Sequence, residues 1–274
     1  MKKRNVLKKI CIYLVLLVVS LFVMLPIYLI VVNSLKTEAE SVVLNLAPPA
    51  IFQFSNYLKV IQKANIPRAM FNGLLVSVFS VITVVIVSSM ASFLLARRLS
   101  KTTKFLYYLF VAGLIAPLPL IPTMRLLQSL NIINTYFGII CIFISVNIPF
   151  SIFLYSGFIK GIPRELDESA ILDGCGPIRL FYQIIFPLLK PVVFTNIILV
   201  FMNVWNDFQY TLYFLGKSSM WNMPLTVYKF VGKYTNQWEL VCADLVLTIL
   251  PVILIYIFAQ KYIISGMTAG AVKG

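Results

Sequence analysis

Long apolar runs constrain this chain more than any other feature. Hydrophobic residues make up 60% of its 274 residues. An α-helix needs about twenty apolar residues to cross a bilayer, and it pairs its backbone N–H and C=O groups internally, as lipid requires. Six such runs occur, at residues 10–32, 69–96, 105–124, 136–158, 191–215 and 240–260. They predict an all-α membrane protein with six transmembrane helices in a single domain over residues 1–274.

Prolines interrupt some of these runs. Pro117 and Pro119 lie in the third run, and Pro149 lies in the fourth. Proline lacks a backbone N–H and kinks or breaks a helix interior. Broken helices often border a cavity in transporters, but kinked helices are common in membrane proteins generally. The prolines therefore predict bent helices without locating a site.

Basic residues are distributed unevenly between the connecting segments. If the first run leads outward, fifteen of the 23 Lys and Arg residues fall on the side of the N-terminus and eight fall on the other. Cytoplasmic segments carry an excess of Lys and Arg. The bias is clearest in the short cationic segment 97–104. It predicts that both termini and residues 160–190 face the cytoplasm.

Composition excludes several kinds of site. The net charge of +14 fits basic cytoplasmic loops better than nucleic-acid binding, because no recognition module accompanies it. The chain has no His and four Cys without a CxxC pair, which argues against a metal site or a catalytic residue. The segment Gly216–Ser218 resembles the end of a phosphate-binding loop but lacks the earlier Gly, so a nucleotide would have to be bound by another chain.

The longest polar interruption, residues 160–190, predicts a helix-turn-helix elbow. A helix can begin just after Pro163, where a missing N–H costs nothing, and its early carboxylates suit the positive end of the helix dipole. Asp173–Gly174 ends this helix, because Gly turns left-handed at no steric cost. Pro177 opens a second short helix, and Pro187 is expected to end it.

The elbow resembles the EAA motif of ATP-binding-cassette (ABC) importer permeases. That pattern is Glu-Ala-Ala, a Gly a few residues later, and then Ile-x-Leu-Pro. Ser169 stands for the first Ala and Phe186 for the Leu, and both changes are mild. The matching positions are Glu168, Ser169, Ala170, Asp173, Gly174 and Pro187. Further landmarks resemble the maltose-type, carbohydrate-importing branch, namely Asn33–Lys36, Pro48–Pro49, Asn56–Tyr57 and Asn72–Leu74.

The resemblance implies the fold of binding-protein-dependent importer permeases. It also implies a function as one of two permease subunits that carry a sugar across the bacterial cytoplasmic membrane. The implied partners are the lipid bilayer, a homologous second permease, two ATPase subunits and an extracytoplasmic sugar-binding protein. ATP and Mg²⁺ would be bound by the ATPases, and no cofactor by this chain. The six matching positions would contact an ATPase cleft, with Glu168 on its surface and Gly174 permitting a close approach.

A different interpretation of the elbow is an amphipathic segment lying on the membrane, because residues 162, 166 and 170 form an apolar stripe. An anionic inner leaflet would repel its acidic face, so docking into a partner is favoured.

Polar residues in the fifth run form a second candidate site. Asn203, Asn206, Asp207 and Tyr210 fall within two helical turns. Intramembrane polar groups usually face a bundle interior or a wet path, and amides with aromatic rings suit hydroxyl-rich sugars. Hydrogen bonding between helices would explain them equally well. The chain could also import a non-sugar solute. An ion-coupled transporter or a membrane enzyme would need well-placed carboxylates or His, which these runs lack.

Overall fold

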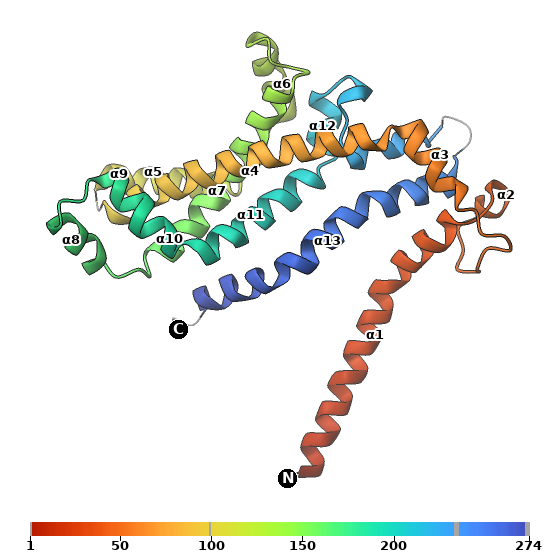
Figure 1. The fold of residues 1–274 in the computed structure, drawn as a ribbon, viewed down its shortest axis with the longest axis horizontal. Helices are drawn as coiled ribbons and strands as arrows, with labels where there is room; N and C mark the ends of the chain where they lie inside the picture. Colours follow the sequence, from red (N-terminus) through yellow and green to blue (C-terminus); the bar gives the residue numbers. More distant parts are fainter. Residues whose placement is uncertain (1, 99, 233–235, 272–274) are drawn as a thin grey trace. The chain divides into compact units, whose positions relative to one another are not determined.

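The computed structural model describes residues 2–98, 100–232 and 236–271, and the chain is helical along most of them (Figure 1). A single antiparallel bridge, Val231 with Asn236, is the only strand-like pairing in that described part. The elements are α1 (Lys2–Ser34), α2 (Glu38–Ser41), α3 (Ser55–Ala64), α4 (Ile66–Arg97), α5 (Lys101–Gly113), α6 (Leu120–Ser129), α7 (Tyr136–Ile159), α8 (Glu165–Leu172), α9 (Pro177–Leu180), η1 (Phe181–Ile185), α10 (Phe186–Leu188), α11 (Lys190–Trp205), α12 (Gln209–Phe214), η2 (Ser218–Met220), η3 (Met223–Lys229) and α13 (Trp238–Ala271).

The chain divides into two compact units, each described here by itself. The first comprises Met1–Pro67 and Thr226–Pro251, and the second comprises Arg68–Leu225 and Val252–Gly274. The single domain expected from the sequence stays a prediction. The expected domain rested on apolar runs, which predict membrane helices but do not predict how the helices group.

Four of the six predicted spans form long apolar helices. By length and composition, α1, α4, α7 and α13 can each cross a membrane. A fifth crossing is possible if α9–α10 and α11, which are bent by 79° at their junction, count as one broken span. Six spans are therefore not confirmed for the described residues.

The third predicted span, residues 105–124, is two short helices instead of one. Helix α5 ends at Gly113 and α6 begins at Leu120. Pro117 and Pro119 explain the break, because neither ring supplies a backbone N–H and each clashes with the preceding turn. Pro119 has an extended backbone at the N-cap of α6.

The fifth predicted span, residues 191–215, is also divided. Helix α11 ends at Trp205, and the chain forms the separate helix α12 from Gln209 to Phe214. The apolar run therefore extends past the end of α11, the helix that contains most of its residues. A polar side chain at this break, described below, forms the cap of α12.

In the first unit, sequence landmarks that lie apart in the chain contact one another. The side-chain amide of Asn56 donates to the carbonyls of Ser34 and Lys36, both at 2.9 Å. The hydroxyls of Ser34 and Tyr57 lie 2.7 Å apart. These bonds pair the carbonyls left open at the end of α1 and hold α3 against it.

Lys36 is buried at the same place, with 2% of its surface exposed. Its ammonium donates to the side-chain oxygens of Asn33 and Asn45, at 3.0 and 2.7 Å. Burying a cation is costly unless its donors are satisfied. The two asparagines therefore explain how this lysine is tolerated beside an apolar helix.

The second unit packs around α7, which contacts α5, α11 and α12. Its largest fully buried side chains include Tyr155, Phe143 and Trp205. Buried polar groups cross between α7 and α11: Ser151 donates to the Asn196 oxygen at 3.0 Å, and the Asn196 amide donates to Tyr155 at 3.2 Å. Such bonds between helices stabilise packing in lipid, where water is absent.

Candidate functional site

The elbow forms as expected, from local backbone signals. Helix α8 begins at Glu165 and ends at Leu172. Gly174 follows with a φ of +77°, and the N–H groups of Gly174 and Cys175 donate to the carbonyls of Ile171 and Ala170, at 3.0 and 2.9 Å. This bond pair is the Schellman arrangement, which satisfies carbonyls at a helix end and needs a left-handed residue.

The second arm of the elbow does not end at Pro187. Helix α9 opens at Pro177, and the chain then widens into a π-helical turn, in which Phe186 donates to Phe181. Pro187 lies in the first turn of α10, which runs on to Leu188. A proline is tolerated in a first turn, and the π-helical turn re-pairs the ladder just before it. The expected stop at Pro187 was therefore wrong by one residue, because α10 ends at Leu188.

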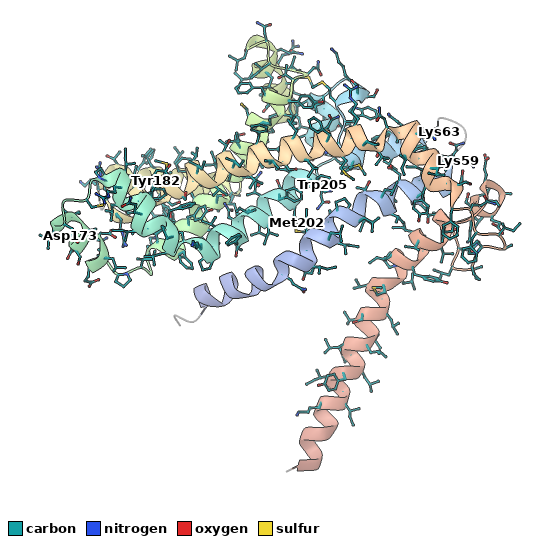
Figure 2. All side chains as sticks on the ribbon, viewed as in Figure 1. Lys59, Lys63, Asp173, Tyr182, Met202 and Trp205 are labelled. Carbon is teal, nitrogen blue, oxygen red and sulfur yellow. The ribbon has the colours of Figure 1, made fainter. Side chains whose placement is uncertain are left out.

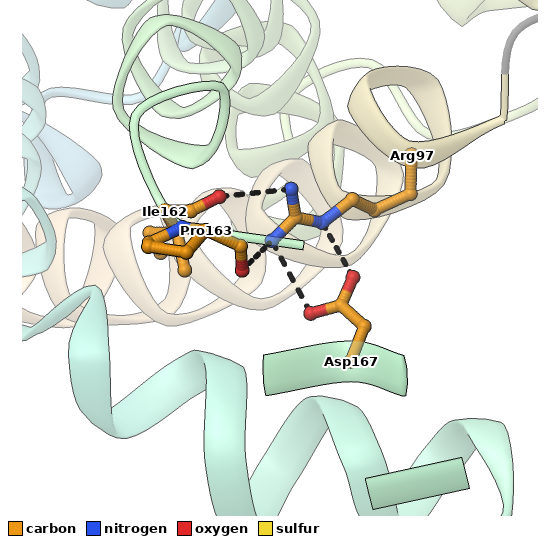
Figure 3. Close-up of polar contacts among 4 residues, drawn as sticks. All are labelled: Arg97, Ile162, Pro163 and Asp167. Atoms are coloured by element: carbon orange, nitrogen blue, oxygen red, sulfur yellow. Dashed lines mark hydrogen bonds and ion pairs between the residues drawn. The ribbon is translucent and has the colours of Figure 1, made fainter. Parts of the chain in front are cut away.

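An ion pair anchors the elbow to the end of α4. Arg97 Nε lies 2.6 Å from Asp167 Oδ2, and Arg97 Nη2 donates to Asp167 Oδ1 at 3.2 Å (Figure 3). Arg97 Nη1 also donates to the Ile162 carbonyl at 3.1 Å. Each side chain of the pair is only 12% exposed. A two-pronged guanidinium–carboxylate contact fixes orientation as well as distance, so α8 cannot turn independently of α4.

The predicted coupling residues lie mostly on the open surface of the elbow. Glu168, Ser169, Asp173, Gly174 and Pro187 are exposed, whereas Ala170 is 5% exposed and packs inward. Figure 2 shows Asp173 at the outer end of this part of the molecule. A Cβ added to Gly174 would meet nothing within 4 Å. The tip of the elbow is thus free to approach another surface.

Two apolar side chains at the tip were missed by sequence reasoning. Leu172 is 88% exposed and Ile178 is 70% exposed. One lies at the end of α8 and the other at the start of α9. Apolar side chains exposed beside carboxylates are typical of contact surfaces between proteins. The sequence carried a signal, since Leu172 lies outside the apolar stripe of residues 162, 166 and 170.

A cleft of about 620 Å³ lies in the second unit. That volume is within the range of small-molecule sites. Its polar lining comes from Ser145 and Asn147 on α7, Asn203 on α11 and Tyr210 on α12. Its remaining wall includes Pro117, Pro119 and Pro149, so the broken third span forms one side of it.

Of the four predicted pathway residues, Asn203 and Tyr210 line this cleft, whereas Asn206 and Asp207 are not among its lining residues. Asn203 also accepts a hydrogen bond from Asn147 at 3.2 Å. Asn203 therefore makes a hydrogen bond between helices, as one of the two interpretations expected, and also lines a cleft. Contact with a substrate stays a prediction for all four.

Asp207 forms the cap of α12. Its carboxylate accepts from the backbone N–H groups of Tyr210 and Thr211, at 3.2 and 2.8 Å, and from the Thr211 hydroxyl at 2.9 Å. These bonds satisfy the open N–H groups at a helix start. Its lone pairs are engaged in holding the break between α11 and α12, which explains its place in the run. Sequence reasoning missed the cap because the run looked like one helix.

Within the residues that the structure describes, no three Cys, Asp or Glu side chains gather where a metal ion could be held. The candidate site therefore consists of the elbow and the cleft, both built from side chains of the second unit.

Comparison with known proteins places this arrangement in a family. Residues 88–269 match the model of the "binding-protein-dependent transport system inner membrane component". The matched stretch includes the elbow and all of the residues that line the cleft.

Two curated relatives align along almost the whole chain. A probable starch degradation products transport system permease protein of Thermoanaerobacterium thermosulfurigenes is 34% identical, with 94% of each chain covered. A melibiose/raffinose/stachyose import permease protein of Bacillus subtilis is 32% identical, with 91% of each chain covered. Both alignments extend well beyond the matched family segment.

A solved structure shares the fold. A chain in the crystal structure of a bacterial ABC transporter involved in the import of the acidic polysaccharide alginate superposes with a TM-score of 0.81. The sequences are 21% identical, and the match covers 92% of this chain and 95% of that one. A second structure, of a bacterial alginate ABC transporter with an alginate pentasaccharide-bound periplasmic protein, gives a TM-score of 0.60 at 17% identity, covering 76% of this chain and 81% of the other.

Proposed function

Because this chain belongs to the family of binding-protein-dependent transport system inner membrane components, we propose that it is the permease subunit of an ABC importer that carries a sugar across the membrane. It is a transport subunit rather than an enzyme. The proposal that the substrate is a sugar rests on similarity along almost the whole chain to two permeases, which are named for starch products and for melibiose, raffinose and stachyose.

The cleft supports the same substrate class. Sugar hydroxyls both donate and accept hydrogen bonds, and the side-chain amides of Asn147 and Asn203 can do both. Tyr210 adds an aromatic ring, packed edge-on against Phe143 with 6.0 Å between ring centroids. Among the residues that the structure describes, those lining the cleft carry no charged side chain. A neutral, hydroxyl-rich solute suits this lining better than an ion or a charged amino acid.

The elbow would receive the driving motion. Its exposed tip, with Leu172 and Ile178 beside carboxylates, suits a groove on an ATPase subunit. The Arg97–Asp167 pair joins α8 to α4, so displacement of the tip would move the end of a membrane helix. The second arm continues through α10 into α11, which carries Asn203. A push on the elbow would therefore reach the cleft along α11.

The complete importer would hold a second, homologous permease, two ATPase subunits and an extracytoplasmic sugar-binding protein. The alginate transporter with its periplasmic protein supports the last of these by analogy. ATP and Mg²⁺ would be bound on the ATPases. We also infer that six segments cross the bacterial plasma membrane with both termini inside, which the excess of Lys and Arg on that side supports.

Uptake by the reconstituted importer tests this function. The permease pair and ATPases would be placed in liposomes with the binding protein outside, and uptake of radiolabelled raffinose, maltotriose, glutamine and inorganic phosphate would be compared. We expect ATP-dependent uptake of at least one of the two sugars and of neither other solute. Uptake without ATP, or of glutamine alone, would contradict the proposal.

A further inference from the structure

A second cavity lies away from the elbow tip and the cleft. It has a volume of about 430 Å³ and lies where α4 ends, α5 begins and α7 ends. Helices α5 and α7 contact each other along its side. Because three apolar helices end or begin here, the cavity lies at the level where a membrane gives way to water.

The cavity is strongly cationic. Its described lining residues include four basic side chains, Arg98, Lys101, Lys104 and Lys160, and no carboxylate. Asp167, the acidic group paired with neighbouring Arg97, is already engaged. Lys160 Nζ lies 4.9 Å from the centroid of the Tyr107 ring, and this cation–π contact keeps the exposed ammonium next to another lining residue of the cavity.

A buried hydroxyl in the lining has no partner. Ser156 is 1% exposed, and its Oγ makes no hydrogen bond to the part of the chain that the structure describes. It lines the cavity together with Ala96 and Leu95. A buried polar atom that lacks a partner is uncommon and points to a missing acceptor or donor. A phosphoryl oxygen would supply an acceptor that also suits the cations.

The surface beyond the cavity is apolar. On α5, Phe105 is 65% exposed and Leu109 is 55% exposed. The two are four residues apart and therefore share a helix face. The cavity thus combines cations at its mouth with an exposed apolar strip leading away along a membrane helix. A free phosphate would use only the first of these features.

We propose that this cavity binds the headgroup of an anionic phospholipid, with the acyl chains lying along the Phe105–Leu109 face. Basic pockets between membrane helices on the cytoplasmic side suit such headgroups. The inference rests on the membrane placement in the proposed function, but not on the identity of the transported solute. The bound lipid would lie one residue from Arg97, the anchor of the elbow.

Lipid retention measures this binding directly. The full-length permease in detergent would be mixed with phosphatidylglycerol or phosphatidylcholine, and bound lipid would be counted by native mass spectrometry. We expect phosphatidylglycerol to be retained preferentially. The double variant Lys101→Gln/Lys104→Gln should weaken its retention about thirtyfold, because each cation near an anionic headgroup contributes about fivefold to binding. Both side chains are exposed, so the variant should fold.

Lys59→Gln/Lys63→Gln is the matched control. It removes two exposed lysines one turn apart on α3 that are not among the lining residues of the cavity, and should leave retention unchanged. Equal retention of both lipids, equal loss in the control, or displacement of the lipid by excess inorganic phosphate would each overturn the proposal. Because no transport is measured, failure of sugar uptake would leave this result standing.

Discussion

Gly174 and Gly176 lie two residues apart in the elbow but differ in backbone conformation. Gly174 has a φ of +77°, whereas Gly176 has a φ of −69°. A Cβ at either position would meet nothing within 4 Å. The same substitution at both positions therefore distinguishes two effects. One is the strain in the left-handed turn at Gly174, and the other is the mere addition of a side chain at the tip.

We expect Gly174→Asp to reduce uptake about tenfold or more while the subunit still inserts. A left-handed conformation costs an L-residue about 1–2 kcal/mol, and 1.36 kcal/mol corresponds to tenfold in rate. ATP-dependent uptake and membrane content would be measured together. Gly176→Asp is the control and should retain most activity. Normal uptake by Gly174→Asp would count against a coupling role for this turn.

Arg97 and Asp167 form the other residue-scale feature that function depends on. Removing either partner leaves a mostly buried charge without its counter-charge. Loss of a partner from a buried pair costs about 3–5 kcal/mol, and from an exposed pair about 0–1 kcal/mol. With 12% of each side chain exposed, we expect the loss of one partner to lower the free energy of unfolding by about 2 kcal/mol.

We predict that Asp167→Asn lowers both the thermal stability of the permease and the uptake rate. Glu165→Gln changes an exposed carboxylate two residues away and is the control. If Asp167→Asn matched Glu165→Gln in melting temperature and uptake, the ion pair would not anchor the elbow.

At the scale of elements, the break between α11 and α12 puts the polar residues of one apolar run in different surroundings. Asn203 lies on α11 and lines the cleft. Asn206 follows the last residue of that helix, is exposed and is not part of the cleft lining. The two amides are chemically identical, so they form a second matched pair.

We expect Asn203→Ala to raise the substrate concentration needed for half-maximal uptake about fivefold, because one hydrogen bond contributes about 1 kcal/mol. Asn206→Ala should change it little. Uptake would be measured over a range of sugar concentrations with the wild-type ATPases. Equal effects of the two substitutions would remove the cleft from the transport path, because Asn206 is not part of its lining.

At the scale of the whole molecule, the open question is which parts face the cytoplasm. Cys175 lies in the elbow and is partly exposed. A variant that keeps Cys175 and replaces the other three cysteines by Ser reports the side of the elbow. A membrane-impermeant maleimide should label it only after the cells are permeabilised. Labelling in intact cells would place the elbow outside, and coupling to a cytoplasmic ATPase would then be impossible.

Sequence alone was sufficient wherever the deciding interactions are local. The lengths of the apolar runs predicted α1, α4, α7 and α13, because a helix pairs its backbone N–H and C=O groups within itself. The elbow followed from Pro163 and Pro177, which restrict φ at their own positions, and from Gly174, which adopts a left-handed φ at no steric cost. The pairing of Arg97 with Asp167, seventy residues apart, has no such local signal.

Only the tertiary structure showed that Asn203 lines the cleft whereas Asp207 caps α12. Only the tertiary structure showed, too, that the two helices of the third run border that cleft. A helical pattern states which side chains share a face, but not which neighbouring helix meets that face. That choice depends on how α5, α7 and α11 pack, and packing is a property of residues brought together from across the chain. Periodicity therefore predicted the elements, whereas contacts between distant residues decided the site.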